Sequence, residues 1–313
     1  MPNYRNSLPQ LGQQLFLTDG GMETTMIFHK HIDLPEFASF PLLDTEDGLA
    51  ALNDYFRTYL DIAAESQTGF VLEATTWRAN RDWGSKLGYD REQLADINRR
   101  SIDFLEKLRD EYVSGGNPIV ISGNIGPRGD GYLADEQMSA DEATDYHREQ
   151  AQVFADTNAD MITAMTLTYP EEAIGVVRAA KEFGMPSVIG FTTETDGRLP
   201  NGSTLEDAIN QVDEATDGGP AYYMVNCAHT DHFGGALADG AEWAHRVRAL
   251  RANASRQSHA ELDEAEKLDD GDPKEFGELH RRLRDRFPQL NVFGGCCGTD
   301  HRHIQEIQRN LDA

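Results

Sequence analysis

The feature that most constrains this chain is a regular alternation of short apolar segments with longer helical ones. Seven segments rich in β-branched and aromatic residues are predicted to be strands: 15–21, 69–76, 118–127, 159–167, 186–193, 221–228 and 291–299. Helical patterns occupy 47–66, 91–112, 139–157, 170–183, 203–215, 274–286 and 300–311. Because parallel strands need long crossover connections, this alternation predicts a parallel sheet built from βα units.

The number of units decides between two parallel-sheet folds. An eighth strand would have to lie between 228 and 290, where 246–253 is the best candidate although its composition is poor for a strand. Eight units in 313 residues predict a (β/α)8 barrel, taken as one domain over 1–313. A doubly wound open sheet is the alternative, but TDGGMET after the first strand lacks its G-x-G-x-x-G turn. The acid-rich segment 259–280 is expected to be a solvated loop and helix outside the barrel.

Charge and hydropathy exclude several classes of function. The formal net charge of -26 argues against binding of nucleic acid or of an anionic membrane surface, since both require a basic surface. No apolar run is long enough to span a bilayer, and the N-terminus lacks a basic patch followed by an apolar run. We therefore expect a cytoplasmic protein that acts on small molecules.

The cysteines provide the strongest chemical signal. Cys227 ends one predicted strand, and Cys296 and Cys297 end another. Adjacent cysteines rarely bridge each other, so a disulfide framework is not expected. The carboxyl ends of barrel strands share one rim, so all three thiols would face one pocket, where three thiolates can hold zinc with a fourth position open. The alternative is three buried thiols that act as small hydrophobic groups.

Five motifs carry a resemblance to a known family. They are LTDGGMET at 17–24, GNIGPRGDGY at 123–132, GFTTETDGRLPNGSTLEDAI at 190–209, VNCAH at 225–229 and GGCCGTDHRHI at 294–304. In these motifs the chain resembles the homocysteine S-methyltransferases, which are zinc-dependent barrels. The pairing of GGCCGT with an upstream NC is the most specific part of this resemblance.

The resemblance implies roles for particular residues. It implies that Cys227, Cys296 and Cys297 bind Zn²⁺, and that Asp19 helps to hold an amino-acid substrate, with a turn or capping aspartate as the alternative. Gly20 and Gly21 would allow close approach of the backbone. Asn226 would support the loop of the first cysteine.

The same resemblance implies an activity. A zinc-bound substrate thiolate, such as that of homocysteine, would attack a methyl group on an activated donor and give methionine. A sulfonium donor, S-methylmethionine or S-adenosylmethionine, suits a short member of the family best. A cation of this kind suits an acidic, aromatic-lined pocket, with Trp77 and Glu73 as possible walls.

Two positions depart from the family pattern. The family usually has a glutamate for the substrate amino group at the end of its fourth strand, where this chain has Met165, while Glu73 stands on the second strand at a position that is commonly neutral. We hypothesise that the carboxylate has moved between strands; otherwise the thiol is not homocysteine, or Glu73 is a buried acid paired with an arginine such as Arg78 or Arg81. The seventh strand also differs, because ALRANAS at 249–255 replaces a proline-asparagine-glycine pattern and leaves the rim near Asn253 in doubt.

Two other classes of function stay open. A zinc hydrolase would use mixed cysteine and histidine ligation, with candidates in CAHTDH at 227–232 and HRH at 301–303. His301 and His303 are two apart on a predicted helix, so their side chains diverge and cannot easily share a metal. A catalytically degenerate barrel that binds zinc or a thiol without turnover is the other alternative.

Overall fold

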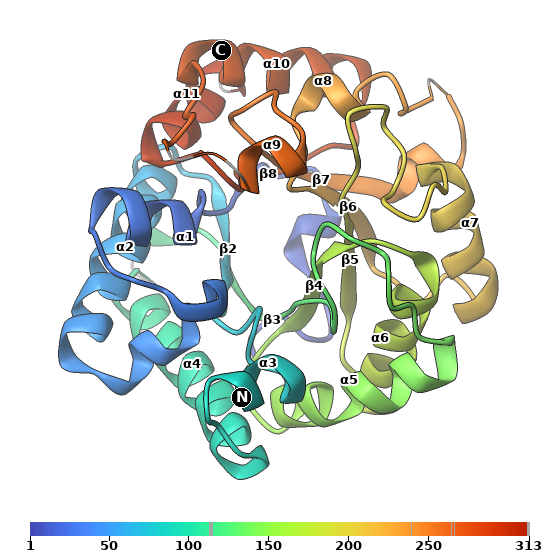
Figure 1. Cartoon of the computed structure of the whole chain (residues 1–313). Coiled ribbons are helices and arrows are strands. Elements are labelled where there is room, and N and C mark those ends of the chain that lie inside the picture. The colour runs from blue at the N-terminus through green and yellow to red at the C-terminus, as the bar shows by residue number, and fades with distance from the viewer. Residues whose placement is uncertain (113–114, 239, 264, 266, 312–313) are drawn as a thin grey trace.

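The computed structural model describes residues 1–313 except 113–114, 239, 264, 266 and 312–313, and it is a closed eight-stranded parallel barrel (Figure 1). The strands pair in chain order, and the last pairs with the first. Their bounds are β1 Phe16–Leu17, β2 Gly69–Glu73, β3 Ile119–Ile125, β4 Met161–Leu167, β5 Ser187–Phe191, β6 Tyr222–Asn226, β7 Val247–Ala252 and β8 Val292–Gly295. The predicted (β/α)8 barrel is confirmed, and the weak candidate at 246–253 forms β7.

Helices surround the barrel and cover its outer face (Figure 1). Their bounds are α1 Met22–Thr24, α2 Glu46–Glu65, α3 Arg81–Lys86, α4 Arg91–Tyr112, α5 Ala140–Ala155, α6 Pro170–Glu182, α7 Leu205–Thr216, α8 Thr230–Phe233, α9 His259–Asp263, α10 Pro273–Arg286 and α11 His301–Leu311. The crossover from β6 to β7 is the exception to long helices, because it contains α8 and the 3-10 turn Trp243–Arg246. No helix among the described residues is both long and apolar enough to cross a bilayer.

Local sequence explains where these helices begin. Ser139 and Glu142 form a reciprocal capping box at the start of α5. Thr204 caps α7, and Asp272 caps α10 directly before a proline in its first turn. These side chains accept hydrogen bonds from backbone N–H groups that have no partner within the helix.

Alternation along the strands divides the apolar side chains into two layers. One layer fills the barrel interior and includes Val71 on β2, Met224 on β6 and Ala249 on β7. The other packs between the strands and the surrounding helices. Because side chains alternate along a strand, residues two positions beyond the interior ones also face inward. That rule places Glu73, Asn226 and Arg251 inside the barrel at its carboxyl end.

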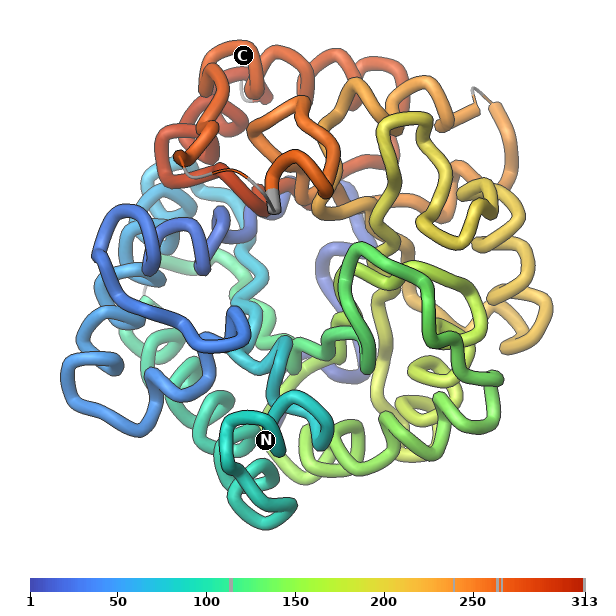
Figure 2. Tube along the Cα trace, viewed as in Figure 1, coloured from blue at the N-terminus to red at the C-terminus, as the bar shows by residue number. Residues whose placement is uncertain are grey.

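The N-terminal segment closes the end of the barrel opposite the carboxyl ends of the strands, and the last helix packs beside the first long helix. Leu8 packs in the interior layer, and the side-chain amide of Gln10 donates to Met161 Sδ at 3.2 Å. At the other end of the chain, α11 lies beside α2 (Figure 2), so the last βα unit packs against the first. The carboxyl end of the barrel carries the cavity described below.

The expectation for the acid-rich segment 259–280 is wrong in part. Its second half forms α10 on the outside of the barrel, as expected. Its first half instead approaches the carboxyl rim, where His259, Leu262 and Leu268 line the cavity. The high acid content masked this role, because acidic residues usually mark a solvated surface.

Candidate functional site

A cavity of about 340 Å³ opens at the carboxyl ends of the strands. This volume suits a small molecule, and this end of a barrel is where active sites form. The residues to which the family resemblance gave a metal or substrate role, together with Glu73, all line it: Asp19, Gly20, Gly21, Glu73, Asn226, Cys227, Cys296 and Cys297. The structure therefore brings together residues that are separated by up to most of the chain length.

The three cysteines form what we call the thiol cluster. Cys227 Sγ lies 2.9 Å from Cys296 Sγ and 3.4 Å from Cys297 Sγ. The three sulfur atoms form the one group of at least three potential metal ligands found among the described residues. All three cysteines are free, so their thiols remain available as ligands.

Strand pairing explains why these thiols meet. Cys227 follows β6, while Cys296 and Cys297 follow β8, and β7 pairs with both strands. The Cys227 N–H donates to the Arg251 carbonyl, and the Cys296 N–H donates to the Ala252 carbonyl. Cys227 has a φ of 57°, in the left-handed region that is uncommon for non-glycine residues and often marks functional sites.

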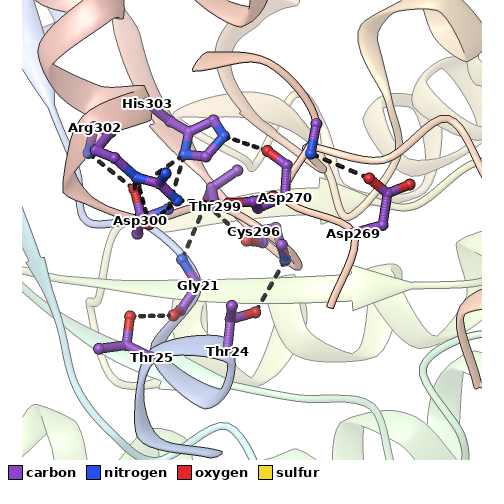
Figure 3. Close-up of polar contacts among 12 residues, drawn as sticks. Gly21, Thr24, Thr25, Asp269, Asp270, Cys296, Thr299, Asp300, Arg302 and His303 are labelled. Carbon is purple, nitrogen blue, oxygen red and sulfur yellow. Dashed lines mark hydrogen bonds and ion pairs between the residues drawn. The ribbon is translucent and has the colours of Figure 1, made fainter. Parts of the chain in front are cut away.

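The loop that carries the adjacent cysteines is fixed to the first βα turn (Figure 3). The Gly298 N–H donates to Thr24 Oγ1 at 3.0 Å, and the Gly21 N–H donates to Thr299 Oγ1 at 3.0 Å. Gly298 has a φ of +79°, and a Cβ there would lie 2.7 Å from a backbone carbonyl oxygen. A Cβ on Gly21 would lie 2.5 Å from the Cys296 carbonyl oxygen. The close backbone approach predicted for Gly21 therefore includes the cysteine loop itself.

A buried ionic cluster fixes the other side of this loop at the start of α11 (Figure 3). His303 contacts Asp300 Oδ1 at 3.2 Å and donates from Nε2 to the Asp270 carbonyl at 2.8 Å. Burial opposes ionisation of Asp300, but hydrogen bonds from His303 and Arg302 outweigh it and hold the pKa of this carboxyl well below its usual range. The cluster thus ties the cysteine loop to the segment that leads into α10.

Two residues at the thiol cluster were missed by sequence analysis. The Tyr132 hydroxyl lies 3.2 Å from Cys227 Sγ and 3.5 Å from Cys297 Sγ. The His259 ring stacks on Tyr132 with centroids 4.4 Å apart, and its Nε2 contacts the Thr193 carbonyl at 3.2 Å. Tyr132 ends a motif that carried the family resemblance, so its place in that motif was an available signal, whereas His259 had none.

A second group, which we call the charge cluster, consists of Asp19, Glu73 and Arg251. Arg251 Nη2 lies 2.6 Å from Asp19 Oδ1, and Tyr55 donates to Asp19 Oδ2 at 2.9 Å. Burial raises the pKa of Glu73 to about 7, against the opposing attraction of Arg251. Burial would also lower the pKa of Arg251, but Asp19 and Glu73 outweigh it and hold that pKa above its usual range. Arg251 therefore stays cationic inside the barrel.

The arginine whose charge acts on Glu73 is therefore Arg251. The two arginines considered in the sequence analysis, Arg78 and Arg81, have other partners. Arg78 lies between the rings of Trp77 and Trp83 and donates to the Gly129 carbonyl. Arg81 pairs with Asp82. Neither makes an ion pair with Glu73 within the described chain.

Asn226 supports the end of a neighbouring strand. Its Oδ1 accepts from the Thr166 N–H at 3.0 Å, and its Nδ2 donates to Thr166 Oγ1 at 2.8 Å. Thr166 has a φ of 62°, which is a strained conformation for a β-branched residue. Met165, at the position usually held by a glutamate in the family, lines the cavity, as does Asn253 beyond β7.

The candidate histidine ligands lie elsewhere. His229 caps α8 and accepts from the Asp231 N–H, while His232 contacts the Arg256 carbonyl. His303 is occupied by Asp300 and Asp270, and His301 is exposed. In the part of the chain that the structure describes, no histidine joins the thiol cluster, so mixed cysteine and histidine ligation has no support.

Comparison with known proteins identifies relatives along nearly the whole chain. A family model described as homocysteine S-methyltransferase matches residues 16–311. A homocysteine S-methyltransferase of Bacillus subtilis, YbgG, is 25% identical over 271 residues, which cover 81% of this chain and 80% of that protein. A selenocysteine Se-methyltransferase of Brassica oleracea is 20% identical and covers 94% of this chain and 88% of that protein.

Solved structures show the same fold. The metallated form of the homocysteine methyltransferase MmuM from Escherichia coli superposes with a TM-score of 0.72 at 16% identity and covers 95% of this chain and 96% of that one. Its oxidised form gives a TM-score of 0.70 at 18% identity, with 98% of this chain and 99% of that one covered. With the family model matching almost every residue of the barrel, the chain belongs to the homocysteine S-methyltransferase family and is a methyltransferase.

Proposed function

We propose that this protein is a zinc-dependent S-methyltransferase that transfers a methyl group from a sulfonium donor to homocysteine and so forms methionine. The observation that carries the proposal is the convergence of three thiols from two strands in a cavity of about 340 Å³. S-methylmethionine and S-adenosylmethionine are the donor candidates. The names of the relatives support homocysteine as the acceptor.

The donor set of the thiol cluster suits zinc. Three cysteine thiolates and one open position are a catalytic arrangement for this metal. Tetrahedral ligands at about 2.3 Å from zinc place sulfur atoms roughly 3.8 Å apart, so contacts of 2.9 and 3.4 Å need only a small expansion. When bound to Cys227, Cys296 and Cys297, zinc would keep the acceptor thiol deprotonated and nucleophilic near neutral pH. No separate general base is then required.

The walls of the cavity support binding of the acceptor beside the cysteines. Gly20 and Gly21 line the cavity next to Cys296, and Asn226 fixes the strand end that faces them. Asp19 and Glu73 supply negative charge on the same side. In this proposal these five residues form the wall that holds an amino acid, directly or through their neighbours, with its thiol toward the cysteines.

Other residues of the cavity support a cationic donor. Trp77 lines it together with Glu23 and Asp130, and Phe28 and Phe37 lie at partly exposed positions of the same cavity. Aromatic faces and carboxylates both attract a sulfonium. The acceptor thiolate would form a bond to the methyl carbon while the bond from that carbon to the donor sulfur breaks, and the donor would leave as a neutral thioether.

Metal analysis tests the proposal directly. Wild type and Cys297→Ser, both purified under reductant, would be measured by elemental analysis and assayed with homocysteine and each sulfonium donor. We expect about one zinc per chain in wild type, and loss of both zinc and methyl transfer in Cys297→Ser, because only two of the three thiolates of the site remain. Arg78→Gln changes another residue of the same cavity and is the control for metal content.

The possible results separate the alternatives. Zinc-free wild type, purified reduced and still active, would contradict the zinc mechanism. Wild type that holds zinc but transfers no methyl group from either donor would favour a degenerate zinc-binding barrel instead.

A further inference from the structure

We propose that Arg251 and Glu73 together recognise the amino-acid end of the acceptor: Arg251 binds the α-carboxylate, Glu73 binds the α-ammonium, and Asp19 positions Arg251. This inference deepens the function proposed above, because it states how the same cavity selects a zwitterionic thiol. It rests on the partners of these three side chains.

Both oxygens of Asp19 contact protein groups, although Oδ1 contacts Arg251 as an ion pair and accepts no hydrogen bond from the described residues. Its Oδ1 lies 2.6 Å from Arg251 Nη2, and its Oδ2 accepts from the Tyr55 hydroxyl at 2.9 Å. Its side chain is almost fully buried by these contacts. A carboxylate held on both oxygens acts on a ligand through the arginine that it orients, so Asp19 is a positioning residue.

One nitrogen of the Arg251 guanidinium is available to a ligand. Its Nε donates to the Gly295 carbonyl at 3.2 Å, and its Nη2 donates to the Gly20 carbonyl at 3.3 Å in addition to the Asp19 pair. Its Nη1 is buried and has no hydrogen-bond partner among the residues that the structure describes. Buried donors without partners are rare because each costs free energy, and guanidinium groups bind carboxylates well. Arg251 also lines the cavity.

Glu73 offers the complementary acceptor. Its side chain is 5% exposed, and its Oε2 is buried without a hydrogen-bond partner. Glu73 and Arg251 interact electrostatically across the barrel, yet they form no direct ion pair. Two opposite charges that line one cavity and stay apart leave room for a ligand that carries both complementary charges on one carbon.

The position of the two groups fits the rest of the acceptor. Arg251 Nε donates to the carbonyl of Gly295, the residue directly before Cys296, so the charge cluster lies next to the thiol cluster. An α-amino acid with a short side chain ending in a thiol would reach from one cluster to the other. A thiol that lacks the carboxylate or the ammonium would leave one of the two charges unpaired, which costs binding free energy.

The test compares three thiols in each protein variant. Homocysteine, aminopropanethiol, which lacks the carboxylate, and sulfanylbutanoate, which lacks the ammonium, are compared by kcat/KM within wild type, Arg251→Gln and Glu73→Gln. A ratio within one variant is independent of how much protein is folded. We expect wild type to prefer homocysteine over each truncated thiol by roughly 10- to 100-fold, the usual effect of one charged hydrogen bond.

The two variants should lose this preference selectively. Arg251→Gln should abolish the preference over aminopropanethiol alone, and Glu73→Gln should abolish the preference over sulfanylbutanoate alone. Arg78→Gln is the matched control, because it removes another arginine of the same cavity and should leave both ratios unchanged. If Arg251→Gln does not fold, Arg251→Lys, which retains the charge but not the forked geometry, should reduce the same ratio.

Two results would overturn the inference: equal loss for all three thiols in Arg251→Gln, which indicates a purely structural arginine, or a wild type that does not distinguish the thiols. Calorimetric binding of the three thiols to zinc-loaded protein, without a donor, separates this inference from the proposed function. Selective binding with no methyl transfer would contradict the function and support the recognition of the amino acid.

Discussion

The thiol cluster and the charge cluster lie in the same cavity but are built in different ways. The thiol cluster comes from two short motifs, and backbone hydrogen bonds and glycine packing hold its loops. The charge cluster comes from β7, β2 and the turn after β1, and its own ionic contacts hold it. Both clusters need the paired strands, but two of the three thiols are adjacent in the sequence, whereas all three members of the charge cluster lie on different strands or turns.

This difference suggests separate roles: the thiol cluster for the reaction and the charge cluster for the choice of substrate. In the proposed function, three thiolates would determine which reaction the cavity performs, because they would select the metal that activates the acceptor thiol. The charges define which thiol enters, because unpaired buried charges penalise the wrong ligand.

The largest effect should come from removing metal, and it should be confined to the thiol cluster. The chain has exactly three cysteines, so an alkylating reagent and intact-mass measurement count their exposure without ambiguity. We expect no adducts on zinc-loaded protein and two, on Cys296 and Cys297, on chelated, reduced protein, because coordination shields these thiolates whereas Cys227 is buried in either case. Glu73→Gln should give the same counts as wild type. Equal alkylation with and without zinc would contradict the assignment of the metal to the thiol cluster.

A smaller effect is expected from Tyr132→Phe. Its hydroxyl contacts two of the three sulfur atoms at 3.2 and 3.5 Å, so the change removes hydrogen bonds to metal ligands. Such losses typically weaken metal binding by about 10- to 100-fold. Competition with a chromophoric chelator measures the zinc affinity, and Tyr89→Phe, which removes an exposed hydroxyl bonded to Asp44, serves as the control. Unchanged affinity in Tyr132→Phe would mean that this hydroxyl does not support the metal.

The two clusters also differ in how far sequence could predict them. Strand ends, glycines and adjacent cysteines are sufficient to predict from sequence that Cys227, Cys296 and Cys297 share one pocket. The reason is that parallel strands fix which strand ends meet. Glu73 was noticed as a departure, but its counter-charge Arg251 was not. Arg251 lies on the poorest strand candidate, and its partners Asp19 and Glu73 are more than 170 residues away along the chain. Pairing of that kind depends on barrel closure and side-chain reach, which composition and spacing do not encode.

Asp19→Asn should affect the charge cluster while the thiol cluster keeps its zinc. The change removes the ion pair that orients Arg251 but keeps the hydrogen-bonding shape of the side chain. We expect the KM for homocysteine to rise by about 10-fold, the effect of one charged contact, with kcat nearly unchanged. Aminopropanethiol is the internal control, because it has no carboxylate for Arg251 to bind and its KM should not change. A fall in kcat for both thiols would instead place Asp19 near the reacting atoms.

The last prediction concerns the dependence of stability on pH, to which Glu73 should contribute through its burial. Its pKa rises from 4.5 to about 7 on folding, so the folded state binds more protons than the unfolded state between these values. The stabilising contribution of protonated Glu73 is therefore complete below pH 4.5 and is lost as pH rises through about 7. The Glu73→Gln variant has no carboxyl group at this position, so its stability does not depend on this ionisation. Between acidic and mildly alkaline pH, its free energy of unfolding should therefore increase by about 3 kcal/mol relative to that of wild type. Urea unfolding of chelated wild type and chelated Glu73→Gln, once at acidic and once at mildly alkaline pH, measures this difference. Parallel curves would show that Glu73 is solvated or already paired, and a ligand ammonium would then gain nothing from it.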